Sequence, residues 1–572
     1  MGSFPEFWSR RAYALRLLLL TMISACTYNE NRMKDSPERN ERMRKHKVAV
    51  FFIKLAVFVC LLAAVLNTVG QLLDAGDDVV QSASALKSLP PNSVDVCWLG
   101  TSHMNYNVIP QYLYDLCGIP STMVTGNSLD LTSSYWQLRQ ALLTQSPQVV
   151  VLDVYAAAAP YCYFYVQNVL ATRYRQGMQP GSNPYNTATG LARWLPIGSP
   201  YKPAAISHSY AVSGADGDAY FQATRLHARY SELGRASFAY ACHQDRWTRN
   251  FGYLYGAQDL TQREVDTRPY TLEAALAANE VGTYWTFSDA QLNEAHLLAQ
   301  TREELERIIH FTREKGIQLV LCAAPYLTNQ AEEKLFDEVA QLAYEQNVPF
   351  VGLDASGIEG REYLRDIGHL NDAGAHLYTA FWADYLTKAY ALPDRRESAD
   401  ARYAPWRDNA GSYDVQSAAM QLLTLDGGLT KYLEAISTLN DDYLLVFSIE
   451  GEVYEGFTED DYLLMTEQLG FPEETLEEWY LSGMGTQDAA LSGGKLLKSA
   501  YAPNGRTQEL HWNLRGHDIK IGCVNGDSAA WSVDGDSLGR VGAGMNIAVY
   551  SLIDHMLMDA RTFDLTQPAW DE

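Results

Sequence analysis

The sequence predicts an α/β domain with a doubly wound, three-layer parallel sheet, preceded by one transmembrane helix and followed by a small mixed α+β, β-rich domain. Three observations lead to this prediction. First, apolar β-branched runs such as 149–154 (VVVLDV) alternate with amphipathic segments, which is typical of strands buried on both faces of a parallel sheet. Second, the apolar run over 48–66 is long enough to span a bilayer as a helix. Third, short strand-like runs separated by Gly and Asp turns follow residue 414, which indicates a separate domain.

Composition narrows the classes of function. The chain has 572 residues, enough for more than one domain, and a formal net charge of −25. A phosphate-binding surface needs clustered Lys and Arg, which this chain gathers only in its first 50 residues, so we expect no nucleic-acid partner. The 36 Tyr and 12 Trp suit a sugar-binding surface, although we expect most of them to pack in the core.

The cysteines do not indicate a metal site or a disulfide framework. There are eight, at positions 26, 60, 97, 117, 162, 242, 322 and 523. They form no CxxC pair and no cluster with metal-ligand spacing, and Cys97 and Cys322 fall inside predicted strands, where a thiol behaves as a small apolar side chain. We therefore expect no disulfide framework, no metal and no cofactor.

The N-terminal region predicts a signal anchor. A cytoplasmic segment over 1–47 carries many Lys and Arg, the helix is expected over 48–67, and acidic residues follow it. The positive-inside rule then places the rest of the chain outside a single-pass membrane. Three alternatives remain open: a cleaved signal peptide, a lipoprotein box ending at Cys26, and a later start at Met22, Met33 or Met43.

The predicted α/β domain spans 93–392, after a connector over 68–92. Its expected strands are 94–99, 149–154, 317–323 and 349–353, and its expected helices are 135–143, 295–315 and 332–346. Between its halves lies a polar and aromatic insertion over 160–290, which is too long for a plain loop and suggests a lid or a substrate platform.

The predicted C-terminal domain spans 414–566, after a charged linker over 393–413. We expect strands over 444–449, 519–524, 529–533 and 547–551 and a helix over 460–469 that Gly470 ends.

The candidate catalytic residues are Ser102, His369 and Asp366. Ser102 follows the first predicted strand, and ligands of open α/β sheets bind at the carboxyl ends of strands. A serine needs a base and an orienting acid, and Asp366 with His369 has the spacing to supply both. Each half is common by chance, but their combination on strand-end loops of one domain predicts a nucleophilic serine site.

These blocks resemble the SGNH/GDSL hydrolase superfamily. The resemblance is carried by Gly100-Thr101-Ser102-His103, the strand over 149–155, and Asp366-x-x-His369-Leu370-Asn371-x-x-Gly374-Ala375. Within the superfamily the chain resembles the membrane-anchored O-acyltransferase-like group, which includes alginate acetylation proteins and the D-alanyl transfer protein of teichoic acid synthesis. The resemblance implies an SGNH-like, flavodoxin-like fold at a bacterial cell surface, a Ser-His-Asp triad, a cell-surface glycan as substrate and a membrane-bound O-acyltransferase as the partner supplying acyl groups.

The oxyanion hole departs from the pattern of that superfamily. A Gly and an Asn in separate blocks usually supply its donors, and here the loop after the second strand region offers Gly126 and Asn127. After the strand over 149–154 the expected Asn is missing, and Asp153 and Tyr155 stand near that strand end. We assign His103 to shaping the turn or contacting the acceptor.

The C-terminal domain carries a second resemblance. The blocks 443–449, 458–470, 542–550 and 559–564 resemble the interleukin-like EMT-inducer (GG-type) domain. That resemblance implies carbohydrate binding, for which Trp512, Trp531 and Asn546 are the candidate residues.

The sequence thus predicts a serine O-acyltransferase, with acetyl as the favoured acyl group, acting on a cell-surface polysaccharide. One alternative is a carbohydrate esterase that uses the same triad with water as acceptor. The other is a non-catalytic glycan-binding or assembly protein with a vestigial triad.

Overall fold

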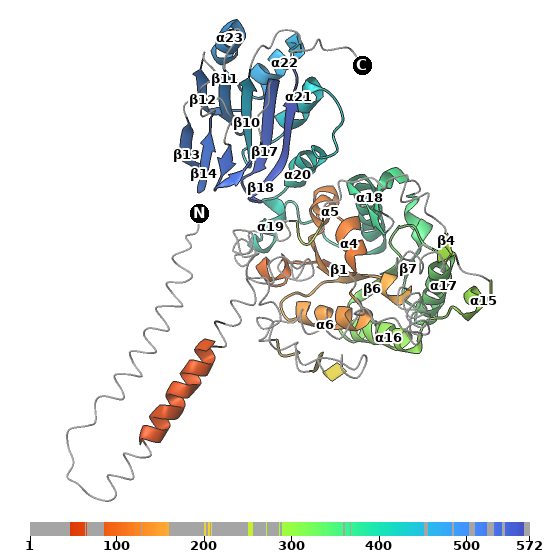
Figure 1. The fold of residues 1–572 in the computed structure, drawn as a ribbon. Coiled ribbons are helices and arrows are strands. Elements are labelled where there is room, and N and C mark those ends of the chain that lie inside the picture. Colours follow the sequence, from red (N-terminus) through yellow and green to blue (C-terminus); the bar gives the residue numbers. More distant parts are fainter. Residues whose placement is uncertain are drawn as a thin grey trace, which may run out of the picture. The chain divides into compact units, whose positions relative to one another are not determined.

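The computed structural model describes part of the chain, and the labels below are those of Figure 1. The described residues are 46–62, 65, 85–126, 129–158, 199–201, 204–205, 207–208, 250–254, 270–271, 285–286, 289–358, 361–366, 368–450, 456–482, 486–502, 509–522, 531–539 and 544–565. The chain divides into two compact units, Met1–Thr68 and Val69–Glu572. Most of the predicted insertion over 160–290 lies outside the described residues.

The predicted transmembrane helix is wrong. Within the part of the chain that the structure describes, no helix is long and apolar enough to cross a membrane. In the region of the expected span, the structure describes residues 46–62 and 65, which are helical. The predicted fold class is corrected accordingly to a parallel sheet with additional antiparallel sheets.

A five-stranded parallel sheet organises the first half of the second unit. In spatial order its strands are β2 (Ser121–Thr125), β1 (Val96–Gly100), β3 (Val149–Asp153), β6 (Gln318–Cys322) and β7 (Phe350–Val351). Every residue of β1, β2 and β3 is buried, because the sheet is covered on both faces. This explains why β1 and β3 appear in the sequence as continuous apolar runs rather than as alternating ones.

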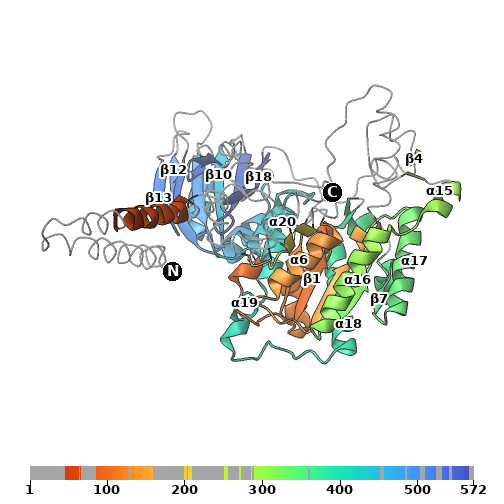
Figure 2. The same ribbon diagram turned by 90° about the horizontal axis from the view of Figure 1, so that it is seen from below.

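Helices cover both faces of this sheet. One face carries α4 (Ser102–Asn107), α5 (Pro110–Cys117) and α18 (Asp372–Ala389); the other carries α6 (Leu131–Ala141), α16 (Ala299–Glu314) and α17 (Gln330–Glu345). Figure 1 shows these layers edge-on, and Figure 2 shows α6, α16 and α17 along the sheet.

Alternate residues of β1 divide between the two layers, as the period of a strand requires. Trp98 packs toward α18, with its ring 5.4 Å from that of Trp382, whereas Leu99 packs with Leu138 of α6 and Leu305 of α16. Burying each large apolar side chain in this way contributes roughly 1.5–3 kcal/mol.

The second half of the unit contains two antiparallel sheets. The strands of the larger sheet have the spatial order β12 (Leu496–Ala502), β11 (Thr486–Leu491), β10 (Tyr443–Glu450), β17 (Gly544–Ser551) and β18 (Met556–Phe563). The strands of the smaller sheet have the order β13 (Leu510–Leu514), β14 (His517–Ile521), β15 (Ser532–Val533) and β16 (Asp536–Ser537). One apolar cluster joins the two sheets, and another packs α21 (Leu429–Ser437) on the larger sheet.

The predicted helix over 460–469 changes character along its length. It is α22 (Glu459–Leu463), which Thr458 caps, followed by a π-helical turn over Leu464–Gln468. Gly470 ends it with φ of 80°, in the left-handed region, and a Cβ there would lie 2.1 Å from the carbonyl oxygen of Gly494.

The remaining described elements are short. They are β4 (Tyr270–Thr271), β5 (Trp285–Thr286), α15 (Asp289–Glu294), three 3-10 turns (Leu353–Ser356, Arg361–Tyr363, Ala401–Tyr403), β8 (Leu364–Asp366), β9 (His369–Leu370), α19 (Ala404–Arg407), α20 (Ser412–Gln421) and α23 (Glu473–Ser482).

Candidate functional site

The turn after β1 presents Ser102 at the carboxyl end of the parallel sheet. Gly100 has φ of 141°, and a Cβ there would lie 2.9 Å from the Cβ of Asp153, so the turn needs glycine. Thr101 then caps α4: its Oγ1 accepts from the N–H of His103 at 3.3 Å and donates to Asp153 Oδ2 at 3.2 Å. Because the strand order reverses between β1 and β3, Ser102 lies at the switch point where open α/β sheets bind ligands.

A small hairpin of β8 and β9 brings Asp366 and His369 to Ser102. The Nδ1 of His369 lies 2.8 Å from Asp366 Oδ1, and its Nε2 lies 2.9 Å from Ser102 Oγ. The backbone N–H of Gly368 also donates to Asp366 Oδ1, at 2.8 Å, and holds the carboxylate in place. The three residues predicted from sequence therefore form one hydrogen-bonded series.

The electrostatics of this series favour an ionised Asp366. Partial burial by itself raises the pKa of this carboxyl group, but the hydrogen bond and charge of His369, the Gly368 N–H and the charge of Arg365 outweigh burial and lower it. An ionised Asp366 accepts the Nδ1–H of His369, which leaves the Nε2 lone pair to accept the Ser102 hydroxyl proton. The side chains of His369 and Asp366 are 22% and 33% exposed, so solvent reaches the pair.

Two asparagines position the series, and sequence reasoning assigned no role to either. The side chain of Asn107, the last residue of α4, accepts from the N–H of Leu370 at 3.1 Å and donates to the carbonyl of Pro325 at 3.3 Å. Asn371 caps α18 by accepting from the N–H of Gly374 at 3.0 Å. An Asn directly before a helix is a recognisable capping signal, whereas no local signal marks Asn107.

His103 lies behind His369 rather than on the surface. It is 3% exposed, and its ring lies 4.0 Å from that of Tyr155, 4.6 Å from that of Tyr326 and 5.4 Å from that of His369. Burial lowers the pKa of His103 well below its usual value; the nearby His369 adds to this and Asp366 opposes it. His103 is therefore a buried packing partner of the His369 imidazole, and Tyr155 stacks on it.

The predicted oxyanion donors do not come together in the described residues. The N–H of Gly126 donates to the carbonyl of Gly100 at 3.2 Å, so this amide is already used, and Asn127 lies outside the described residues. Asp153, which stands where an Asn is expected, is fully buried and accepts from Thr101 and from the N–H of Tyr155 at 3.3 Å. Its role is to hold the turns after β1 and β3.

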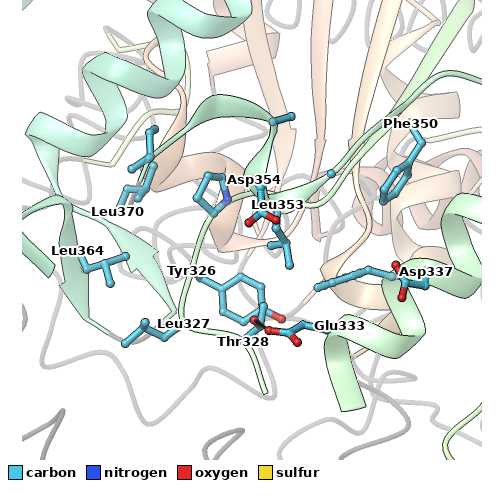
Figure 3. A pocket seen from close by; sticks show the side chains of 15 residues that line it. Tyr326, Leu327, Thr328, Glu333, Asp337, Phe350, Leu353, Asp354, Leu364 and Leu370 are labelled. Atoms are coloured by element: carbon cyan, nitrogen blue, oxygen red, sulfur yellow. Dashed lines mark hydrogen bonds between the residues drawn. The ribbon is translucent and has the colours of Figure 1, made fainter. Parts of the chain in front are cut away.

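A cavity of about 600 Å³ is lined in part by Leu370, the residue that follows His369 (Figure 3). Its lining combines apolar side chains, the ring of Tyr326 and the acidic Glu333, Asp337 and Asp354. Leu364 and Leu370, which flank the hairpin bearing Asp366 and His369, line it opposite α17. None of Ser102, Asp366 and His369 lines the cavity.

The carbohydrate-binding candidates of the C-terminal half differ in exposure. Trp531 is 2% exposed and packs between the two sheets, with the partly exposed Trp512 against the same cluster. Asn546 is fully buried, and its side-chain nitrogen donates to the carbonyl of Ser448 at 3.2 Å. Of the three, Trp512 is therefore the one whose side chain is exposed enough to contact a ligand.

Comparison of the sequence with known protein families and with curated proteins finds no match. The assignment of chemistry therefore rests on geometry. A hydroxyl, an imidazole and a carboxylate in series can activate the hydroxyl as a nucleophile and return its proton to a leaving group.

Proposed function

We propose that this protein is a serine acyltransferase that moves an acyl group, through an acyl-enzyme on Ser102, to a hydroxyl group of a carbohydrate. The observation that carries the proposal is the 2.9 Å contact between His369 Nε2 and Ser102 Oγ, with Asp366 2.8 Å behind the imidazole. The resemblance of the Ser102 and His369 blocks to the SGNH superfamily supports a glycan acceptor and a membrane-bound O-acyltransferase as the source of acyl groups.

The reaction proceeds in two halves. In the first, Ser102 Oγ attacks the acyl carbonyl while its proton passes to His369 Nε2, and the tetrahedral intermediate collapses as His369 returns that proton to the leaving group. In the second, His369 takes the proton of the acceptor hydroxyl, the resulting oxygen attacks the acyl-enzyme, and the proton returns to Ser102. Asp366 stabilises the imidazolium that forms in each half.

The cavity that Leu370 lines in part supports a carbohydrate substrate. Asp337 and Asp354 offer carboxylate oxygens that accept hydrogen bonds from sugar hydroxyls, and Tyr326 offers an aromatic ring. In this proposal the sugar occupies the cavity, and its ester bond lies towards the hairpin that bears His369.

A second candidate, a carbohydrate esterase, is favoured by one observation. His369 is 22% exposed, so water reaches the base that would activate it, and an acyl-enzyme open to water hydrolyses. The esterase uses the same residues and differs only in the acceptor.

The test is hydrolysis of p-nitrophenyl acetate by the full chain beside Ser102→Ala, with chito- and xylo-oligosaccharides as acceptors. Serine-dependent release that one sugar accelerates, with an acylated sugar as product, supports the transferase. Release that no sugar affects supports the esterase. If Ser102→Ala releases p-nitrophenol as fast as the parent and a fluorophosphonate probe fails to label Ser102, the triad is inactive. A glycan-binding or assembly role then replaces the transferase and the esterase.

The sugar site has its own test. Asp354→Asn should raise KM for the sugar about five- to tenfold, the loss expected for one hydrogen bond, and leave p-nitrophenyl acetate hydrolysis unchanged. The matched control is Asp384→Asn, because Asp384 is exposed on α18 and paired with Lys388. An unchanged KM in Asp354→Asn would remove the cavity from the proposal.

A further inference from the structure

His517, at the start of β14, lies between two groups that only accept hydrogen bonds. Its Nε2 lies 2.8 Å from the carbonyl oxygen of Leu552, and its Nδ1 lies 2.7 Å from Asp534 Oδ2. A neutral imidazole has one N–H to donate. If Nε2–H donates to Leu552, the lone pair of Nδ1 faces the carboxylate, and a cation bound by both atoms satisfies both.

His555 brings a third ligand atom to the same place. The ring of His555 lies 4.7 Å from that of His517, and one ligand atom from each of His517, Asp534 and His555 lies within 4.8 Å of the other two. The three residues come from β14, the turn between β15 and β16, and the turn between β17 and β18. The cluster therefore joins the smaller antiparallel sheet to a hairpin of the larger one.

The surroundings hold this cluster in position. The side chains of His517 and Asp534 are 2% and 1% exposed. The other carboxylate oxygen of Asp534 accepts from the N–H of Asp518 at 2.8 Å, and the N–H of Asp534 donates to the carbonyl of Asp518 at 2.7 Å.

Two of the three residues lie in tight turns. Asp534 and His555 have φ of 60° and 55°, in the left-handed region. Asp and His are among the non-glycine residues found there most often, and Asp534 with Gly535 forms the two-residue turn between β15 and β16. The turns of two neighbouring hairpins thus place Asp534 and His555 beside His517.

We propose that His517, Asp534 and His555 bind a divalent transition metal ion, with Zn²⁺ the best match to two imidazoles and a carboxylate. The Nε2–H of His517 donates to the Leu552 carbonyl, which is the second contact that metal-bound histidines usually make and which fixes Nδ1 as the ligand atom. A water or an incoming ligand completes the coordination. The metal ties the smaller sheet to the β17–β18 hairpin and stabilises this half of the protein.

The experiment is titration of the chelator-treated full chain with Zn²⁺, and with Co²⁺ for its visible spectrum. We expect one equivalent of Zn²⁺ per chain and a higher midpoint of thermal unfolding in its presence. Asp534→Asn and His555→Asn should each weaken Zn²⁺ binding by at least about a hundredfold, since loss of a second contact alone costs 10–100-fold. Asn suits both positions because it tolerates the left-handed backbone.

The matched control is His511→Asn, because His511 pairs with Asp518 on the exposed surface of the same small sheet. This variant should bind Zn²⁺ as the parent does. The proposal is overturned if the parent binds no stoichiometric Zn²⁺, which would make His517 and Asp534 a buried ion pair, or if both Asn variants bind as tightly as the parent. Should a variant fail to fold, the Co²⁺ spectrum of the parent decides: a four-coordinate spectrum supports the site, and that of the hexaaqua ion overturns it.

Discussion

The side-chain oxygen of Asn107 accepts a hydrogen bond from the N–H of Leu370 at 3.1 Å. Asn107 ends the helix that begins at Ser102, and Leu370 directly follows His369. This contact therefore ties the helix that bears Ser102 to the hairpin that bears His369.

Asn107→Ala should lower kcat for p-nitrophenyl acetate by about ten- to a hundredfold with little change in KM, because small misplacements of reacting groups have large effects. It should also lower the free energy of unfolding by about 1–3 kcal/mol, since the N–H of Leu370 loses its acceptor. Steady-state kinetics and urea unfolding measure the two effects.

The control for Asn107 is Asn105→Ala. Asn105 lies in the same helix and is equally buried, but its side-chain nitrogen donates to the carbonyl of Gly252, away from the hairpin. This variant should lose stability and keep kcat. Equal losses of kcat in both variants would reduce Asn107 to a general stabiliser of α4.

The triad should behave as one unit. Ser102→Ala and His369→Ala should each lower kcat by on the order of a thousandfold or more, and the double variant should lose little beyond either, because the remaining residue has no partner to act on. Asp366→Asn should lose less, since it disturbs the orientation and charge of His369 without removing the base. Additive losses in the double variant would show that Ser102 and His369 act independently.

Asp153 should make stability depend on pH. Burial raises the pKa of this carboxyl group to about 7, despite the opposing hydrogen bonds from Tyr155, Ala324 and Thr101, whereas an unfolded aspartate titrates near about 3.9. Between these values the folded state keeps a proton that the unfolded state has lost, so the free energy of unfolding falls as pH rises from about 4 to about 7.

Asp153→Asn removes this titration. From pH 5 to pH 8 its free energy of unfolding should therefore rise relative to the parent, by on the order of a few kcal/mol. Urea unfolding at both pH values measures the difference, and the exposed Asp384→Asn should follow the parent. Parallel pH profiles for Asp153→Asn and the parent would mean that Asp153 titrates normally.

Gly100→Ala should be more destabilising than an ordinary glycine substitution at positive φ. The new Cβ meets the Cβ of Asp153 at 2.9 Å, whereas a Cβ at Gly316, with φ of 69°, meets nothing within 4 Å. We expect Gly316→Ala to cost about 1–2 kcal/mol from backbone strain and Gly100→Ala about 1–3 kcal/mol more from overpacking. Chemical unfolding gives both values. Because Ser102 is two residues further on, kcat should fall only in Gly100→Ala.

Much of the parallel sheet could be predicted from local pattern. The expected strands over 94–99 and 149–154 correspond to β1 (Val96–Gly100) and β3 (Val149–Asp153), because strands buried on both faces are continuously apolar. The expected strand over 349–353 is shorter in the structure, where it is β7 (Phe350–Val351). Because β7 lies at the edge of the sheet, few of its residues are buried and the apolar pattern marks its ends poorly. The predicted membrane helix was wrong: within the described residues no helix is long and apolar enough to cross a membrane.

The sequence by itself determined the features of the site that depend on residues close together in the chain. The i, i+3 spacing of Asp366 and His369 places carboxylate and imidazole in contact, and the turn after an apolar strand places Ser102 at a strand end. Only the tertiary structure decided that His369 reaches Ser102, that Asn107 holds them together, and that His517, Asp534 and His555 meet. The reason is physical: periodicity records which face of an element is buried, whereas the convergence of distant loops depends on strand order and on how the layers pack.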